Sequence, residues 1–158
     1  MENNFFAENG YCHVKGLYTA NELGKIRPIL DKFHYNWLLE NQRFYQSRGI
    51  NSSGLTGAAC LSTEEKFTLF EFICADTLLN QVKGVVAEPQ FMNTQLFFNP
   101  YNPKQANYWH RDMQYHFELD APKAALYGPE VLHCRVAFED EPGIEVIPGS
   151  HKNWDSDE

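Results

Sequence analysis

The sequence predicts an α+β fold in which helices come first and an antiparallel β region follows. Two helix-start patterns lie before residue 89, and from Pro89 onward apolar residues recur with a period of two, as they do in strands. Asn/Pro-rich or acidic turns divide this later half into short runs. The length of 158 residues suits one domain, which we expect to be helical over about 1–88 and β over about 89–158. This order of elements favours a sandwich or jelly roll.

The first predicted elements are a short extended segment and a long helix. Residues 5–17 are interpreted as one or two strands, with glycines at 10 and 16 as turn points. Thr19 and Glu22 have the spacing of a capping box, and apolar residues then recur at helical spacing through Phe33. Pro28 falls inside this pattern, so we expect the helix to start later than the box or to bend at the proline.

A loop and a second helix follow. Residues 46–59 are rich in Gly, Ser and Asn without any period, which predicts a loop. Ser62 and Glu65 form a second capping-box pattern, and the apolar run behind them ends at Gly84. We therefore predict a second helix, in one or two pieces.

Four strands are predicted after residue 89, at 90–98, 108–117, 131–138 and 144–147. Successive residues of a strand point to opposite faces, so His110 and Asp112 share one face of the second strand. That face also receives Tyr108, Gln114 and His116, whereas Trp109 lies on the mainly aromatic face. A polar face of this kind either meets water or lines a site, and the period alone leaves both readings open.

Charge and composition exclude several classes of function. Thirteen basic against twenty-one acidic residues give a net charge of −8, the wrong sign for binding a nucleic-acid backbone. The chain starts without a signal-peptide pattern and contains no apolar stretch of about eighteen residues, so we expect a soluble, cytoplasmic protein without a membrane segment. The four cysteines form no CxxC pair and are interpreted as free thiols, buried or partly buried.

The pair His110 and Asp112 has a chemical interpretation. An oxygen-activating ferrous site uses two imidazoles and one carboxylate on one face of the metal, and His-x-Asp on a strand offers two of these three ligands. The spacing alone is weak support, because an exposed polar strand face produces the same pattern. The surrounding sequence has to decide.

Two stretches of the chain resemble the phytanoyl-CoA dioxygenase family of iron(II)- and 2-oxoglutarate-dependent oxygenases. They are FFNPYNPKQANYWHRDMQYH and, some thirty residues later, EPGIEVIPGSHK, and the N-terminal FFAENGYCHVKGLYTANELGKIRPILD is also similar to that family. The resemblance implies a double-stranded β-helix in which His110, Asp112 and a later histidine hold iron, with 2-oxoglutarate as cosubstrate and oxygen and a small molecule as substrates. It also implies that Gln95 and Asn99, on the preceding strand, contact 2-oxoglutarate; hydrogen bonds within the sheet are an equal alternative. The carboxylate of Asp112 favours hydroxylation over halogenation, because halogenating relatives replace it with a small residue.

The sequence departs from the family pattern at its end. The distal histidine and the arginine that pairs with 2-oxoglutarate lie beyond the PGSH segment in the family, and four late strands are about half of a jelly roll, so we expect a truncated domain. His116 is about 20 Å along the strand from His110, too far to share its metal. His133 is a weaker candidate, and His13, His34 and His151 are expected to be structural. Arg135 could pair with a ligand carboxylate or with one of the acids at 139–141.

Two other classes of function stay open at this point. The first is a non-catalytic jelly-roll binding protein whose polar strand face holds a small ligand or water. The second is a catalytically dead family member that acts as an interaction partner. A response of iron binding to His110→Ala separates the enzyme from the binding protein.

Overall fold

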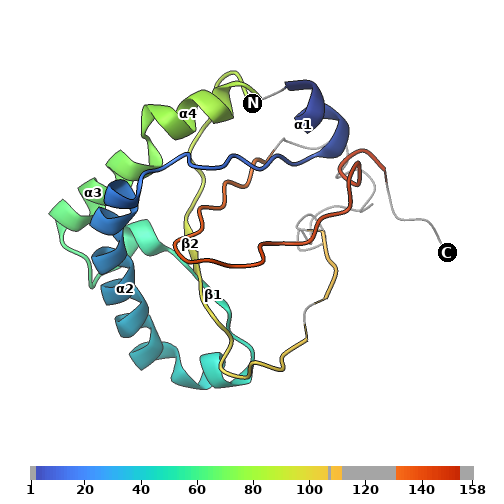
Figure 1. Ribbon diagram of the computed structural model, residues 1–158. Coiled ribbons are helices and arrows are strands. Elements are labelled where there is room, and N and C mark those ends of the chain that lie inside the picture. Colours follow the sequence, from blue (N-terminus) through green and yellow to red (C-terminus); the bar gives the residue numbers. More distant parts are fainter. Residues whose placement is uncertain (1–2, 107, 112–130, 154–158) are drawn as a thin grey trace.

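The computed structural model describes residues 3–106, 108–111 and 131–153. In chain order its elements are α1 (Asn3–Asn9), α2 (Ala20–Ser47), β1 (Asn51–Ser53), the 3-10 helix η1 (Leu55–Gly57), α3 (Thr63–Ile73), α4 (Asp76–Lys83) and β2 (Gln95–Phe97). Figure 1 shows α2, α3 and α4 along one side of the small β1–β2 sheet. The combination of helices with an antiparallel sheet confirms the α+β class.

The N-terminal segment begins with a helix, so the strand predicted there is wrong. Helix α1 ends at Asn9, whose side-chain amide donates to Phe5 O at 3.0 Å. Gly10 follows with φ of 80° and donates its N–H to Phe6 O at 2.8 Å. A glycine with positive φ directly after the last helical residue is a common helix C-cap. The glycine that indicated a turn between strands is therefore the end signal of a helix.

Helix α2 begins where the capping box predicts. The Thr19 hydroxyl accepts from Glu22 N at 3.2 Å, and the Glu22 carboxylate accepts from Thr19 N at 2.7 Å. These contacts satisfy two backbone donors that a helix start leaves unpaired. Pro28 lies inside the helix without ending it, and the residue with non-helical angles is Asn41, at φ −120° and ψ 22°. The bend expected at the proline thus lies more than three turns later.

The second predicted helix forms in two pieces, α3 and α4, separated at Cys74 and Ala75. Its capping box is present: Ser62 Oγ accepts from Glu65 N at 3.2 Å, and the Glu65 carboxylate accepts from Ser62 N at 2.7 Å. Lys32 of α2 donates to the same carboxylate at 2.7 Å and joins the two helices. Glu65 therefore fixes both the start of α3 and its position against α2.

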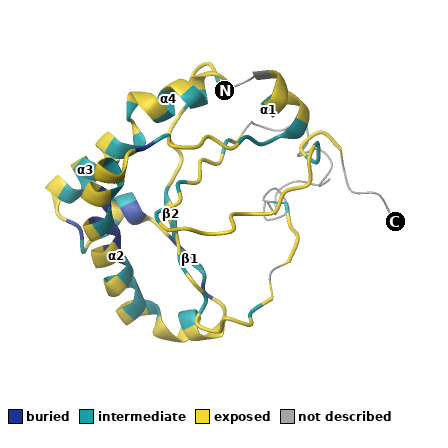
Figure 2. Ribbon diagram, viewed as in Figure 1, coloured by how far each residue is buried: buried dark blue, intermediate teal, exposed yellow. Residues whose placement is uncertain are grey.

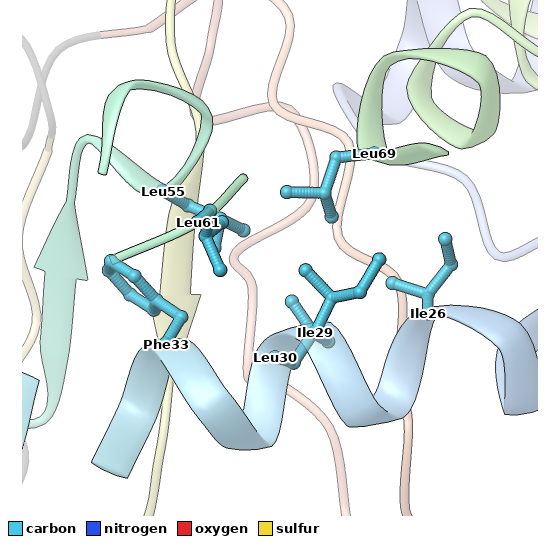
Figure 3. Packing of buried hydrophobic residues seen from close by; sticks show 7 residues of the cluster. All are labelled: Ile26, Ile29, Leu30, Phe33, Leu55, Leu61 and Leu69. Atoms are coloured by element: carbon cyan, nitrogen blue, oxygen red, sulfur yellow. The ribbon is translucent and has the colours of Figure 1, made fainter. Parts of the chain in front are cut away.

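The core lies where α2, η1 and α3 meet. Its buried apolar residues are Ile26, Ile29, Leu30, Phe33, Leu55, Leu61 and Leu69. In Figure 3 the side chains of α2 point toward those of the η1 region and α3, and Leu69, at 2% exposed, is the most buried of them. Burying one such aliphatic side chain contributes roughly 1.5–3 kcal/mol. The helical half of the chain thus carries the main apolar stabilisation among the described residues.

Tyr18 closes the edge of this core. Its ring stacks on Phe72 with centroids 4.2 Å apart, and its hydroxyl donates to Phe72 O at 3.0 Å. Burial, with a smaller contribution from the charge of Glu22, raises the pKa of Tyr18 to about 12. The hydroxyl therefore stays protonated and keeps its donor role at physiological pH.

The β1–β2 sheet corrects the loop predicted at 46–59. Ser52 pairs with Leu96 at the centre of the antiparallel register, and the 4%-exposed Ser52 faces the core with it. Phe98 N donates to Ile50 O at 2.9 Å, and Gly54 N donates to Thr94 O at 3.1 Å, so the pairing extends past both ends of the strands. The Gly/Ser/Asn-rich composition predicted a loop because nothing in it indicates that residues 51–53 pair with β2.

Three of the four later strands do not form in the described residues. Only 95–97 of the first predicted strand is a strand, and 108–111, 131–138 and 144–147 have no regular structure. A strand needs a neighbour for its backbone donors and acceptors. Among the described residues, no backbone ladder joins 131–146 to another segment. Figure 2 shows this region mostly exposed, and Ile144 and Ile147 are 63% and 56% exposed.

The four cysteines are free, as predicted. Cys12 and Cys60 are partly buried, but Cys74 and Cys134 are exposed, so the expected burial is wrong for half of them. Of the helices in the described part of the chain, none combines the length and apolar character needed to cross a membrane.

Candidate functional site

The predicted cosubstrate residues Gln95 and Asn99 lie on the open side of β2 and its extension. Side chains at 95, 97 and 99 are exposed, whereas those at 94, 96 and 98 are partly buried, as the alternation of a strand requires. Leu96 packs against the core. The structure therefore brings Gln95 and Asn99 to one face, four residues apart, as the sequence predicts.

Aromatic packing holds the end of β2 on helix α2. The ring of Phe98 lies 4.6 Å from that of His34, 4.9 Å from Trp37 and 5.7 Å from Tyr45, measured between centroids. The Tyr45 hydroxyl also donates to Asn99 O at 3.2 Å. Because Phe98 is fixed toward the helix, its neighbour Asn99 is held on the open side.

Polar groups and one cation share this open side. Asn51 Nδ2 lies 3.5 Å from Gln95 Oε1 across the strand pair. The guanidinium of Arg135 lies over the ring of Phe97, 5.3 Å from its centroid. Of the acids considered for Arg135, the structure selects Glu141, which accepts from Nε at 3.1 Å and from Nη2 at 2.8 Å. Sequence reasoning did not foresee the Phe97 contact, because it joins segments 38 residues apart and has no local signal.

The predicted iron ligand His110 lies in an exposed, irregular segment. Its Nδ1 is 3.3 Å from Tyr108 O, and its ring centroid is 5.2 Å from that of Tyr108. Asp112 lies outside the described residues, so the shared face of His110 and Asp112 stays a prediction. Trp109, expected on the opposite, mainly aromatic face, is 63% exposed, and His110 is exposed as well, so exposure does not separate the two faces here.

Arg111 anchors this segment to the turn at residues 148–153, which contains the PGSH motif and is called the PGSH turn below. Its Nη1 donates to Ser150 O at 2.5 Å, and its Nη2 donates to Asn153 O at 2.9 Å. Arg111 is partly buried while its neighbour His110 is exposed, so the two side chains meet different surroundings. No local pattern identifies Arg111 as an anchor, because its partners are 39 and 42 residues away.

The PGSH turn is in turn fixed to helix α1. Gly149 N donates to Asn9 O at 2.9 Å, and His151 Nε2 lies 3.2 Å from Ala7 O. The His151 ring also lies so close to Gly10 that a Cβ there would be 2.3 Å from Nδ1. His151 thus has the structural role expected of it, and the turn links the N-terminal helix to the segment of His110.

The described side chains supply only some of the ligands that a ferrous site needs. The imidazole of His110 is a suitable donor, but within 3–106, 108–111 and 131–153 no three His, Cys, Asp or Glu side chains come together as a metal site. His133, the weaker candidate, is exposed, and it joins no such group with His110 in the part of the chain that the structure describes. The donor chemistry of His110 fits iron, whereas the described residues do not supply a complete set of ligands.

The comparisons with known proteins give one match. A family model described as Phytanoyl-CoA dioxygenase (PhyH) matches residues 6–158. No curated protein and no solved structure gives a significant match. The matched range contains β2, the His110 segment and the PGSH turn.

Proposed function

The chain belongs to the phytanoyl-CoA dioxygenase family, and from this premise we propose that it is an iron(II)- and 2-oxoglutarate-dependent oxygenase that hydroxylates a small molecule. The observation that carries the proposal is the match over residues 6–158, which includes the His-x-Asp pair and the VIPGSH segment in the family's order. The same membership supports a jelly roll as the fold of the β region.

The proposed ligands of iron are His110 and Asp112, a neutral imidazole and a carboxylate, which are two of the three donors of a ferrous facial triad. Bound iron would supply oxygen activation, while the protein orients the reactants around it. A carboxylate at 112 would occupy the space that halogenating relatives open for halide with a small residue. Hydroxylation is therefore the proposed outcome.

Gln95 and Asn99 are the proposed contacts of 2-oxoglutarate. Both side chains lie on the open face of β2, and Phe98 and Tyr45 hold that strand end against α2. An amide side chain can donate to a carboxylate and accept from a hydroxyl, so it can orient a dicarboxylate without adding charge. The binding-protein alternative, in which the polar face of the strand that carries His110 holds a small ligand, requires no metal.

Two readouts test the proposal. The first is ferrous-iron binding by the purified chain, for which we expect His110→Ala and Asp112→Ala to weaken affinity by at least about a hundredfold, more than the loss of a residue that only supports a ligand. His133→Ala is the matched control and should bind iron as the wild type does. The second readout is succinate formation from 2-oxoglutarate in the presence of iron.

The outcomes separate the candidate functions. Iron binding that is insensitive to His110→Ala contradicts the ligand assignment and favours a non-catalytic binding protein. Loss of binding in His133→Ala instead would show that the wrong histidine was chosen. Iron binding without succinate formation favours a catalytically dead member of the family.

A further inference from the structure

The open face of β2 combines an aromatic ring, a cation and amide groups. Gln95 and Phe97 point to the same side, opposite to Leu96, and Asn51 of β1 pairs with Phe97 in the register. Arg135 reaches this side from a distant segment and lies over the Phe97 ring. A guanidinium over an aromatic face keeps its planar edge available for hydrogen bonds.

The Arg135 guanidinium already presents that edge to a carboxylate. Its Nε and Nη2 donate to the two oxygens of Glu141 at 3.1 and 2.8 Å, a two-point pairing of the kind that recognises carboxylates in ligands. Both side chains are about one-third exposed, at 37% for Arg135 and 34% for Glu141. A pair of this exposure is weak, so another carboxylate can compete with Glu141.

The segment that carries Glu141 is held independently of this pair. Arg27 of α2 donates to Phe138 O and forms an ion pair with Glu139 at 3.1 Å. Phe138 also packs against the core. Release of the Glu141 side chain from Arg135 therefore leaves the backbone of residues 138 and 139 in place.

We propose that Arg135, on the open face of β2, is a binding site for a carboxylate of a small-molecule ligand, and that Glu141 occupies it until the ligand displaces it. The Phe97 ring forms the floor beneath the guanidinium, and Gln95 offers amide hydrogen bonds on the same strand face. The ligand carboxylate belongs either to 2-oxoglutarate or to the substrate that is oxidised. Both sources rest on the proposed function, whereas carboxylate binding at the site does not require iron.

The test measures ligand binding by the full chain without metal, so that chelation by iron does not contribute. The probes are 2-oxoglutarate, glutarate and hexanoate, titrated separately and followed by ligand-observed NMR. We expect Arg135→Gln to weaken binding by roughly ten- to a hundredfold, the effect of losing hydrogen bonds to a charged group. Arg135→Lys should lose part of the affinity, because an ammonium lacks the planar fork.

Whether Glu141→Gln raises or lowers the affinity for the ligand decides between the proposal and structural damage. Removing a competing carboxylate should tighten binding by about two- to fivefold, the range that corresponds to a weak exposed pair. Structural damage would weaken binding instead, so this variant separates the two explanations. Glu139→Gln disrupts an exposed pair of the same type on the same segment but keeps the contact of Arg27 with Phe138 O, so it should leave binding unchanged.

Each outcome bears on the proposal. Binding of 2-oxoglutarate and glutarate through Arg135, without hexanoate, identifies the cosubstrate as the source, whereas equal binding of hexanoate identifies a carboxylate substrate. Unchanged binding in Arg135→Gln, weaker binding in Glu141→Gln, or no binding of any probe to the wild type overturns the site. Succinate formation by a chain whose ligand binding is unchanged in Arg135→Gln would leave the proposed oxygenase intact while this site fails.

Discussion

Gly10→Ala tests the contact between helix α1 and the PGSH turn. Gly10 has φ of 80°, and a Cβ on it would lie 2.3 Å from Nδ1 and 2.7 Å from Cγ of His151. A side chain at positive φ costs about 1–2 kcal/mol. The His151 ring must also move, which disturbs its contact with Ala7 O at a cost of about 0.5–1.5 kcal/mol. We expect the free energy of unfolding to fall by about 1.5–3.5 kcal/mol, the sum of these two costs.

Gly16→Ala is the matched control, because Gly16 has φ of 65° but no atom within 4 Å of the added Cβ. Urea unfolding of both variants isolates the His151 contact as the difference between them. In the double variant Gly10→Ala/His151→Ala the clash is removed, so its cost should be smaller than the sum of the single changes. Amide exchange at Gly149, which donates to Asn9 O, should accelerate in Gly10→Ala. Equal destabilisation by Gly10→Ala and Gly16→Ala would refute the reasoning.

Three further predictions concern the core and two titrating groups. Leu69→Ala should lower the free energy of unfolding by about 2–5 kcal/mol, while Phe67→Ala, at an exposed position of the same helix, should change it by less than about 0.5 kcal/mol; similar losses would contradict the packing. Hydrogen bonds from Lys32 and from the Ser62 backbone lower the pKa of Glu65 below 4.5, so its stabilisation is present above that pH and is lost as the pH falls through the lowered pKa. Urea midpoints of wild type and Glu65→Gln should therefore differ at neutral pH and converge in acid; a constant gap would argue against the carboxylate. Burial lowers the pKa of His34 below 6.5, so the folded state binds fewer protons and loses stability as the pH falls below that value. His34→Phe keeps a ring against Phe98 and should show a flatter stability profile between about pH 7 and pH 5; an unchanged profile would assign the slope to other groups.

The helix starts were predictable because capping is local. Thr19 with Glu22, and Ser62 with Glu65, make their reciprocal hydrogen bonds within four residues of chain. The donors and acceptors concerned are therefore adjacent in the sequence, and no distant segment can change the pattern. The end of α1 is local as well, but a glycine at position 10 fits a turn between strands and a helix end equally, so the sequence alone does not distinguish them.

Strand pairing was not predictable in the same way, because a period of two assigns faces without assigning a neighbour. Leu96 was expected in a strand, and it forms one only because Ser52 lies opposite. Ser52 belongs to a polar run that has no strand pattern of its own. Residues 144–147 have the pattern, but among the described residues they have no paired neighbour.

In the candidate site, too, the features set by local sequence were predictable, whereas those set by distant contacts were not. Alternation along β2 predicts that Gln95 and Asn99 share a face, and their exposure agrees with it. The choice of Glu141 over its two acidic neighbours was open from sequence, because all three lie within reach of Arg135. In the structure Glu139 pairs with Arg27, and Glu141 rather than Asp140 pairs with Arg135.

The contacts of the PGSH motif in the structure explain its role, and they could not be predicted because they join segments far apart in the sequence. Its turn accepts two hydrogen bonds from Arg111 and meets α1 through Gly149 and His151. Because Arg111 is the neighbour of His110, a change at Gly10 reaches the His110 segment through a chain of direct contacts rather than through the apolar core. Gly10→Ala should therefore alter the backbone around His110, whereas Leu69→Ala should lower global stability without a selective effect there. Amide exchange at residues 108–111 that responds equally to both variants, relative to global unfolding, would contradict this separation.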